Sequence, residues 1–495
     1  MGLFQKQNLQ MNEKEHVMFR IFKRKPISLD IFSLLIFLFG MSMMRLYAQT
    51  DQPLPVLQPP LPLVTIDSPN STVSVPTWKF DFGSGNVEKG YVKVLPDLRY
   101  SEKTGYGFIT DSALVSVDRR GGNALLQDYI TGNNGFYFSV DVPEGNYDVT
   151  VILGDQEGET ETNIKAESRR LMIDKVRTAP GEFKTVMFTT NVRYSSINDS
   201  ENVSLKPREI GHLDWDKQLT IEMNGRHPGV CALEISKTEE AITIYLAGNS
   251  TVTDQRYEPW AAWGQMLPSF FKPGKVSVAN HAESGEAMKS FVAEHRLQKI
   301  LSIIKPGDYL FIQFAHNDQK PASSAYVEPF TGYKEYLKLY IDKARRHGAT
   351  PVLITPMHRR TFDDSGKIIN SHGDYPEAMR QVAAEENVAL IDLHKMSQKL
   401  YEALGIEGSK KAFVHYPAGT FPGQTEELKD NSHHSTYGAY QLARCIVEGI
   451  KASNLEITKY LKDDITPYDP AHPDAYLNWY WLISPKITIE KPEGS

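Results

Sequence analysis

One serine stands where a nucleophile could act. Ser250 follows the apolar run Ile242–Leu246, in the segment Ala-Gly-Asn-Ser-Thr-Val. Gly248 permits a sharp turn, so we expect Ser250 to be exposed at the start of a helix, where free backbone N–H groups can stabilise an oxyanion. The structural alternative is a plain helix cap, a role that Asn249 or Ser250 would fill well.

A base and a carboxylate occur together much later in the chain. A serine hydroxyl becomes nucleophilic when a histidine, oriented by a carboxylate, takes its proton. The polar loop Asp430–His434 (Asp-Asn-Ser-His-His) supplies both groups three positions apart. The order Ser, Asp, His therefore predicts a triad of Ser250, His433 and Asp430. The alternatives are a helix-capping loop and a metal site, and the metal site is disfavoured because no Cys or His partner stands at standard ligand spacing.

Two further polar turns could stabilise negative charge. Asn280–Gly285 (Asn-His-Ala-Glu-Ser-Gly) and Phe314–Asp318 (Phe-Ala-His-Asn-Asp) each follow an apolar run. A backbone N–H at Gly285 and the amide of Asn317 can donate to an oxyanion, together with the N–H of Ser250. Either segment alone is also an ordinary polar turn.

Alternating strands and helices must position these turns. Short apolar strands are expected after residue 238, at Ile242–Leu246, Lys275–Ala279, Tyr309–Phe314, Pro351–Ile354 and Val388–Leu393. Apolar residues at helical spacing over 333–344 and 439–450 predict helices between and after them. This rhythm predicts a parallel sheet covered by helices on both faces, with active residues in loops beyond the carboxyl ends of the strands.

The preceding half of the chain has the pattern of an all-β domain. Apolar residues alternate along Phe136–Val142 and Tyr147–Leu153, and the turn Pro143–Asn146 between them predicts a hairpin. Further strands are expected at 183–189 and 219–223. We predict a β-sandwich over 77–238 and an α/β domain over 239–495.

The first 76 residues differ from the rest. Lys23–Lys25 precede a nearly continuous apolar run, Ile31–Met44, and small or polar residues follow at Ala48–Thr50. This pattern predicts a signal peptide over 1–50 and a secreted or periplasmic product. A retained membrane anchor is the alternative, although the run is short for a spanning helix of about 20 residues. Residues 51–76 are rich in proline and predict an extended linker.

Charge and cysteine content narrow the class of protein. The formal net charge of −7 argues against general nucleic-acid binding, which needs a basic surface. Cys231 and Cys445 both stand among apolar residues, so we expect two buried thiols. Stability must then come from hydrophobic cores.

The polar segments together resemble the conserved blocks of the SGNH (GDSL-type) hydrolase superfamily over residues 241–450. The matching residues, in block order, are Ser250, Gly285, Asn317, and Asp430 with His433. Two residues depart from the family pattern: Asn249 replaces an aspartate and Ala315 replaces a glycine. Neither departure removes a triad or oxyanion group.

Within the superfamily, three segments are similar to those of rhamnogalacturonan acetylesterases: Gly248–Val252, His316–Lys320 and Thr355–Arg360. The resemblance implies a flavodoxin-like catalytic domain that hydrolyses acetyl esters on a pectin backbone without metal or cofactor. The sandwich resembles the galactose-binding-like modules found beside carbohydrate-active enzymes.

We expect an acidic polysaccharide to be bound by positively charged side chains at the active site. We predict that the substrate is bound by Lys320, His358, Arg359, Arg360 and His434. Ordinary solvated charges are the alternative reading of each. No nucleic acid and no stable protein partner are expected. Three alternatives to the pectin esterase remain open: an acetylesterase acting on another polysaccharide such as xylan, a lipid esterase, and a non-catalytic carbohydrate-binding protein.

Overall fold

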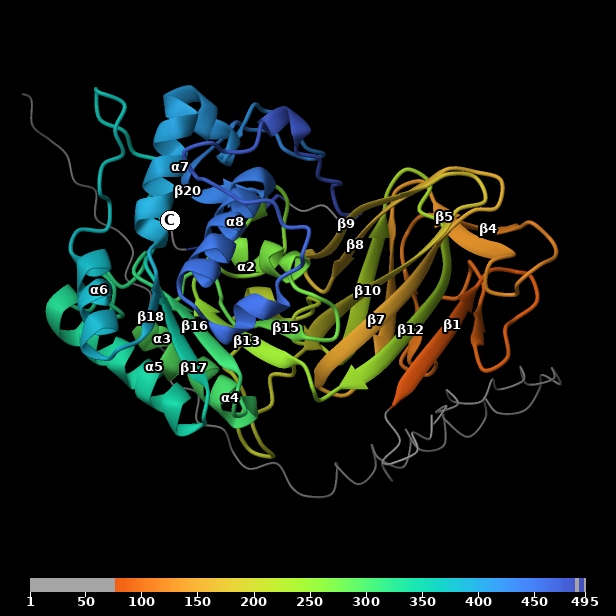
Figure 1. Cartoon of the computed structure of the whole chain (residues 1–495), viewed down its shortest axis with the longest axis horizontal. Coiled ribbons are helices and arrows are strands. Elements are labelled where there is room, and N and C mark those ends of the chain that lie inside the picture. The colour runs from red at the N-terminus through yellow and green to blue at the C-terminus, as the bar shows by residue number, and fades with distance from the viewer. Residues whose placement is uncertain (1–75, 486–488, 494–495) are drawn as a thin grey trace, which may run out of the picture. The chain divides into compact units, whose positions relative to one another are not determined.

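The computed structural model describes residues 76–485 and 489–493, which form an all-β part followed by an α/β part (Figure 1). The predicted signal peptide and nearly all of the predicted linker lie outside these residues. Across the described ranges, no helix has the length and apolarity needed to cross a bilayer.

The all-β part is a sandwich of two sheets. One sheet has the order β10-β7-β12-β1-β2, with β5 also pairing with β12 and β4 with β5; the other has the order β3-β6-β11-β8-β9. The strands are β1 (Thr77–Phe82), β2 (Val92–Val94), β3 (Tyr106–Ile109), β4 (Leu114–Asp118), β5 (Asp128–Gly132), β6 (Phe136–Asp141), β7 (Gly145–Gly154), β8 (Thr160–Ala166), β9 (Arg170–Thr178), β10 (Phe183–Val192), β11 (Gln218–Asn224) and β12 (Val230–Thr238). Their inward-facing side chains form one aromatic-rich core, in which Phe138 contacts both Phe80 and Phe108.

The predicted hairpin is wrong. Strand β6 pairs with β3 and β11, whereas β7 pairs with β10 and β12 in the other sheet. The turn at Pro143–Asn146 therefore crosses from one sheet to the other. Alternating apolar residues indicate which face of a strand is buried, and two strands in facing sheets satisfy that pattern as well as two paired strands do.

The α/β part is built on a five-stranded parallel sheet of order β15-β13-β16-β17-β18. Its strands are β13 (Ile242–Gly248), β15 (Val276–Asn280), β16 (Tyr309–Gln313), β17 (Thr350–Ile354) and β18 (Ala389–Ile391). Numbered along the chain, this order is 2-1-3-4-5, which is the flavodoxin-like arrangement. The predicted fold class is confirmed. In such sheets ligands bind where the winding reverses, here beyond the ends of β13 and β16.

Helices cover both faces of this sheet (Figure 1). Successive strand residues face opposite sides: Ile244 and Leu246 join one core, and Tyr245 and Ala247 join the other. The α-helices are α2 (Trp263–Met266), α3 (Met288–Ala293), α4 (Arg296–Ile303), α5 (Lys334–Arg346), α6 (Tyr375–Glu385), α7 (Leu393–Gly408) and α8 (Thr436–Ala452). Short turns of other helix types are η1 (Pro207–Glu209), η2 (Leu267–Phe270), η3 (Pro329–Tyr333), η4 (Ser409–Lys411), η5 (Glu456–Tyr460) and η6 (Tyr476–Asn478).

A small antiparallel sheet carries the Asp-x-x-His segment. It has the order β14-β20-β19, with β14 at Trp260–Ala261, β19 at Phe413–Tyr416 and β20 at Leu428–Ser435. The segment Asp430–His434 therefore lies on a strand, not in the loop that we expected. Val414 pairs with Asp430 and Phe413 with His434, so the three residues between them bulge out of the ladder.

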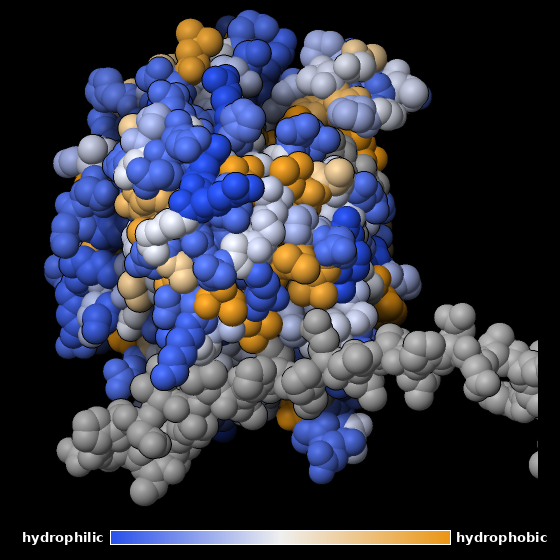
Figure 2. All heavy atoms as spheres, turned by 90° about the vertical axis from the view of Figure 1, so that its right-hand side faces the viewer, coloured by the Kyte–Doolittle hydropathy of each residue, from blue (hydrophilic) through white to orange (hydrophobic). Residues whose placement is uncertain are grey.

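Both cysteines are buried and unpaired, as predicted. Burial raises the pKa of the Cys231 and Cys445 thiols, which keeps them protonated. On the face of the molecule seen in Figure 2, apolar side chains lie in small groups among hydrophilic ones.

Candidate active site

Ser250, His433 and Asp430 form a hydrogen-bonded chain. The Nε2 atom of His433 lies 2.9 Å from Ser250 Oγ, and its Nδ1 atom lies 2.8 Å from Asp430 Oδ2. All three side chains are buried. The bulge in β20 lifts His433 out of the strand toward the serine. This is the arrangement that a nucleophile, its base and an orienting carboxylate require.

Asp430 is held in the ionised form by several donors. Burial acts to raise its pKa, but hydrogen bonds from the His433 side chain and from the backbone N–H groups of Ser432 and His433 outweigh burial, so the pKa lies well below its usual value. The indole of Trp260 donates to the same carboxylate at 3.2 Å. Four hydrogen bonds therefore hold this carboxylate in place.

The environment of Ser250 differs from the expectation in two ways. Ser250 lies in a turn after β13, with no helix directly following, and it is only 2% exposed. The side chain of Asn249 accepts hydrogen bonds from the backbone N–H and the hydroxyl of Thr251, at 3.1 and 2.9 Å. Such a side-chain bond competes with helix formation. Any oxyanion donor at Ser250 is thus a turn N–H and not a helix terminus.

The two predicted oxyanion residues lie on neighbouring loops. Gly285 has φ +81°, a conformation that favours glycine. The amide nitrogen of Asn317 donates to the carbonyl of Glu286 at 2.8 Å. This bond ties the two loops together, and an amide nitrogen carries a second hydrogen for another acceptor.

Asp318 and Ala315 shape the loop that carries Asn317. The Asp318 carboxylate accepts from the backbone N–H of Met288 at 2.8 Å and from that of Ala315 at 2.9 Å. Ala315 has φ +136°, a conformation that L-residues other than glycine rarely adopt. The departure from the family's glycine therefore places backbone strain beside the site.

Three of the predicted substrate-binding residues lie on loops after β16 and β17. Arg359 donates to the carbonyls of Ser371 and His316, at 3.3 and 3.2 Å. Arg360 donates to the side chain of Asn431, within the β20 bulge, at 3.2 Å. Burial and the charge of Arg359 lower the pKa of Lys320. Arg359 and Arg360 therefore hold loops in place, and their role in binding substrate stays a prediction.

His358 and His434, which we predicted to bind substrate, are both buried in the structure. The side chain of His434 is fully buried against Phe413, and Tyr401 Oη lies 2.7 Å from its Nε2. His358 is 2% exposed and packs on His394, with ring centroids 3.7 Å apart. Burial lowers the pKa of His358 to about 4 and that of His434 to about 3, so both rings are neutral at pH 7 and cannot pair with a uronate as cations.

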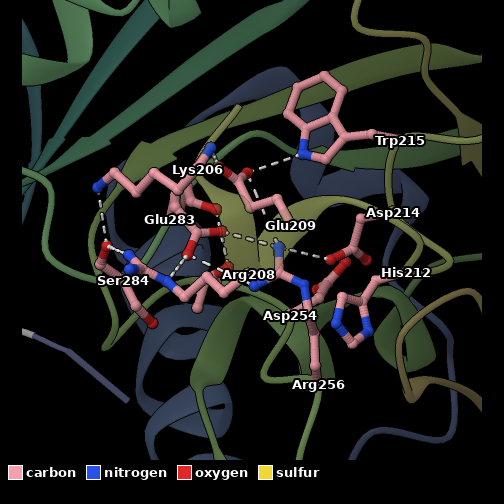
Figure 3. A network of polar contacts seen from close by, with 12 residues as sticks. Lys206, Arg208, Glu209, His212, Asp214, Trp215, Asp254, Arg256, Glu283 and Ser284 are labelled. Atoms are coloured by element: carbon pink, nitrogen blue, oxygen red, sulfur yellow. Dashed lines mark hydrogen bonds and ion pairs between the residues drawn. The ribbon is translucent and has the colours of Figure 1, made fainter. Parts of the chain in front are cut away.

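Sequence reasoning missed two contributors. Trp260 is one of them, and no local pattern in the sequence links it to a carboxylate 170 positions away. The segment Lys206–Trp215, between β10 and β11 of the sandwich, reaches the loop that carries Gly285 (Figure 3). Arg208 in this segment bonds to the carbonyl of Ser284. No local pattern signals such a contact, since it joins residues 76 positions apart in the chain. Within the described ranges, no three His, Cys, Asp or Glu side chains converge as metal ligands do.

Comparison with known proteins gives the family. The model described as the GDSL-like lipase/acylhydrolase family matches residues 246–409. Rhamnogalacturonan acetylesterase RhgT of Bacillus subtilis is 42% identical over 225 residues, which are 45% of this chain and 95% of that relative. The chain belongs to the GDSL-like lipase/acylhydrolase family. It is a carboxylic ester hydrolase, and the predicted superfamily resemblance is confirmed.

The comparisons also cover the region before the GDSL-like domain. A model described as beta-agarase/YXIM esterase-like, galactose-binding domain-like, matches residues 78–183, which confirms the predicted type of sandwich. The uncharacterized esterase YxiM of Bacillus subtilis is 28% identical over 393 residues, 76% of this chain and 91% of the relative. The crystal structure of that protein is similar over 77% of this chain and 99% of its own, with a TM-score of 0.41.

Proposed function

We propose that this chain is a serine esterase that removes acetyl groups from the rhamnogalacturonan backbone of pectin. The observation that carries the proposal is the hydrogen-bonded chain Ser250–His433–Asp430, with distances of 2.9 and 2.8 Å. Its domains are an export signal over 1–50, a linker over 51–76, the sandwich over 77–238 and the catalytic domain over 239–495. After cleavage of the signal, the mature protein is secreted or periplasmic.

In the first half of the reaction, Ser250 becomes acetylated. His433 Nε2 takes the hydroxyl proton while Ser250 Oγ attacks the acetyl carbonyl carbon. The negative charge that develops on the carbonyl oxygen is met by the N–H groups of Ser250 and Gly285 and by the amide of Asn317. When the intermediate collapses, the bond to the sugar oxygen breaks and His433 returns the proton to that oxygen.

In the second half, water releases the acetyl group. His433 takes a proton from a water molecule that attacks the acetyl-serine carbonyl, and the same donors hold the oxyanion. Collapse breaks the bond to Ser250 Oγ, which recovers its proton from His433, and acetate leaves. Asp430 stays ionised throughout and holds His433 with Nδ1–H toward the carboxylate.

The substrate class rests on relatives and on sequence similarity. RhgT is named a rhamnogalacturonan acetylesterase, and the second relative, YesY of Bacillus subtilis, is named a probable one and is 41% identical over 220 residues, 95% of its length. Each match covers less than half of this chain but 95% of the relative.

The test is acetate release from acetylated rhamnogalacturonan and from acetylated xylan, measured side by side for the wild type and Ser250→Ala. We expect release from the pectin substrate and none from Ser250→Ala, with Ser269→Ala, a partly buried serine that bonds to the carbonyl of Met266, as the control. Equal release from both polymers would leave the triad and reject the narrow substrate. Release that survives Ser250→Ala would reject the nucleophile.

A further inference from the structure

A cation from the sandwich reaches the proposed active site. Arg208 lies in η1, within the connection from β10 to β11, and its guanidinium contacts the loop that follows β15 (Figure 3). The Nη2 atom donates to the carbonyl of Ser284 at 2.5 Å, and Ser284 precedes the oxyanion candidate Gly285. A residue outside the proposed catalytic domain therefore contacts the residue that precedes a proposed oxyanion donor.

The guanidinium is fixed in orientation. Its Nε atom donates to Glu283 Oε1 at 3.1 Å, while Arg256 donates to the other oxygen of the same carboxylate at 2.8 Å. Lys206 also donates to the Ser284 carbonyl, at 3.1 Å. Because two of its three nitrogens have partners within the fold, Arg208 presents its third nitrogen, Nη1, in a set direction.

That third nitrogen already holds a carboxylate. Arg208 Nη1 lies 2.7 Å from Glu493 Oε2, and the Glu493 side chain is 65% exposed. A Cβ placed on Gly285 would lie 3.2 Å from the same Glu493 oxygen and 3.6 Å from Arg208 Nη2. The Glu493 carboxylate thus lies on Arg208 beside Gly285, at a place that solvent reaches.

We infer that Arg208 binds a carboxylate of the substrate chain, supplied by a uronate of the proposed pectin substrate. The inference deepens the proposed function and rests on it. Glu493 occupies the position that the uronate carboxylate takes, and the two compete. The sandwich is then a part of the substrate-binding site, since it supplies the residue that recognises charge.

The experiment separates charge recognition from loop positioning. Wild type and Arg208→Gln are compared on acetylated rhamnogalacturonan and on the same polymer after its carboxyl groups have been reduced to alcohols. We expect KM on the acidic polymer to rise roughly tenfold in Arg208→Gln, as for loss of one hydrogen bond to a charged group, with KM on the reduced polymer unchanged. Arg177→Gln, an exposed sandwich arginine paired with Glu161, is the matched control.

Three results in these experiments would overturn the inference. An equal rise in KM on both polymers, or an equal fall in kcat on both, would make Arg208 a support of the loop. If Arg208→Gln does not fold, Glu493→Gln decides: removal of the competing carboxylate should lower KM on the acidic polymer roughly threefold and leave the reduced polymer unchanged. An unchanged KM on both would reject carboxylate binding.

Failure of the proposed substrate is distinguishable from failure of this inference. If the wild type hydrolyses 4-nitrophenyl acetate but not the polymer, the pectin assignment is wrong. Competitive inhibition of that hydrolysis by free galacturonate, with galactose as the neutral control, then tests Arg208 directly. We expect inhibition by galacturonate that is roughly tenfold weaker in Arg208→Gln. Equal inhibition of both proteins would reject the role of Arg208.

Discussion

Arg170 Nη2 lies 2.9 Å from Asp254 Oδ2, and both side chains are fully buried. Arg170 belongs to strand β9 of the sandwich, and Asp254 lies four positions after Ser250 in the catalytic domain. Asp254 also accepts from the Asn280 side chain at 2.8 Å. The sandwich is thus tied by an ion pair to the segment that carries Ser250, the proposed nucleophile.

Replacing Arg170 by Leu should destabilise the fold by about 3–5 kcal/mol, because the change leaves the Asp254 carboxylate buried without its cation. Urea denaturation followed by tryptophan fluorescence measures the loss. Lys338→Leu, which breaks the exposed pair Lys338–Glu385, is the control and should show no measurable change. A loss equally small in both variants would contradict a structural role for the buried pair.

Trp260→Phe should lower kcat roughly tenfold and leave KM unchanged, since it removes a hydrogen bond to the ionised Asp430 while keeping most of the ring. Steady-state hydrolysis of 4-nitrophenyl acetate measures both constants. Trp479→Phe loses a comparable indole bond, to Thr436 Oγ1 at 3.1 Å, and serves as the control. If kcat falls equally in both variants, the effect is not specific to the bond with Asp430.

Ala315→Gly should raise the free energy of unfolding by about 1 kcal/mol. Relief of strain at φ +136° is worth about 1–3 kcal/mol, and the greater freedom of glycine in the unfolded chain offsets about 0.5–1 kcal/mol of it. Chemical denaturation of both proteins tests this. Asn454→Gly changes a residue at φ +51°, which asparagine tolerates, and should gain nothing. Destabilisation by Ala315→Gly would show that the strain is absent.

His394→Gln should make stability less dependent on pH. Burial and the neighbouring His358 lower the pKa of His394 to about 3 in the fold, against 6.5 in the unfolded chain. As pH falls below 6.5, His394 binds a proton in the unfolded chain but not in the folded protein. The contribution of His394 to the free energy of unfolding is therefore complete above pH 6.5 and is lost at lower pH. Between pH 7.5 and 5.5 the wild type should lose about 1.4 kcal/mol more than the variant.

The free energy of unfolding of both proteins is measured at the two pH values. The difference between the two proteins then removes the contribution of the titrating groups that they share. His472→Gln alters a histidine whose side chain is 85% exposed and is the matched control. Parallel losses in wild type and His394→Gln would show that His394 takes up its proton in the folded state.

Sequence patterns predicted much of the fold because the relevant physics is local. Apolar residues at spacings of two and near 3.6 mark strands and helices directly, so the alternation after residue 238 predicted the parallel sheet. The same patterns cannot report which strands pair, and for this reason the hairpin of β6 with β7 was wrong. Asp430–His434 is polar enough to resemble a loop, yet it is held as a strand by its partners Phe413 and Val414.

The residue types and order of Ser250, Gly285, Asn317, Asp430 and His433 were evident from the sequence by itself, because each stands in a short recognisable motif after an apolar segment. Only the tertiary structure decided the distances among them, the burial that makes His434 and His358 neutral, and the arrival of Trp260 and Arg208 at the site. The physical reason is separation along the chain. His433 Nε2 and Ser250 Oγ are 183 positions apart, and contacts of that range arise from the packing of whole elements rather than from any local preference.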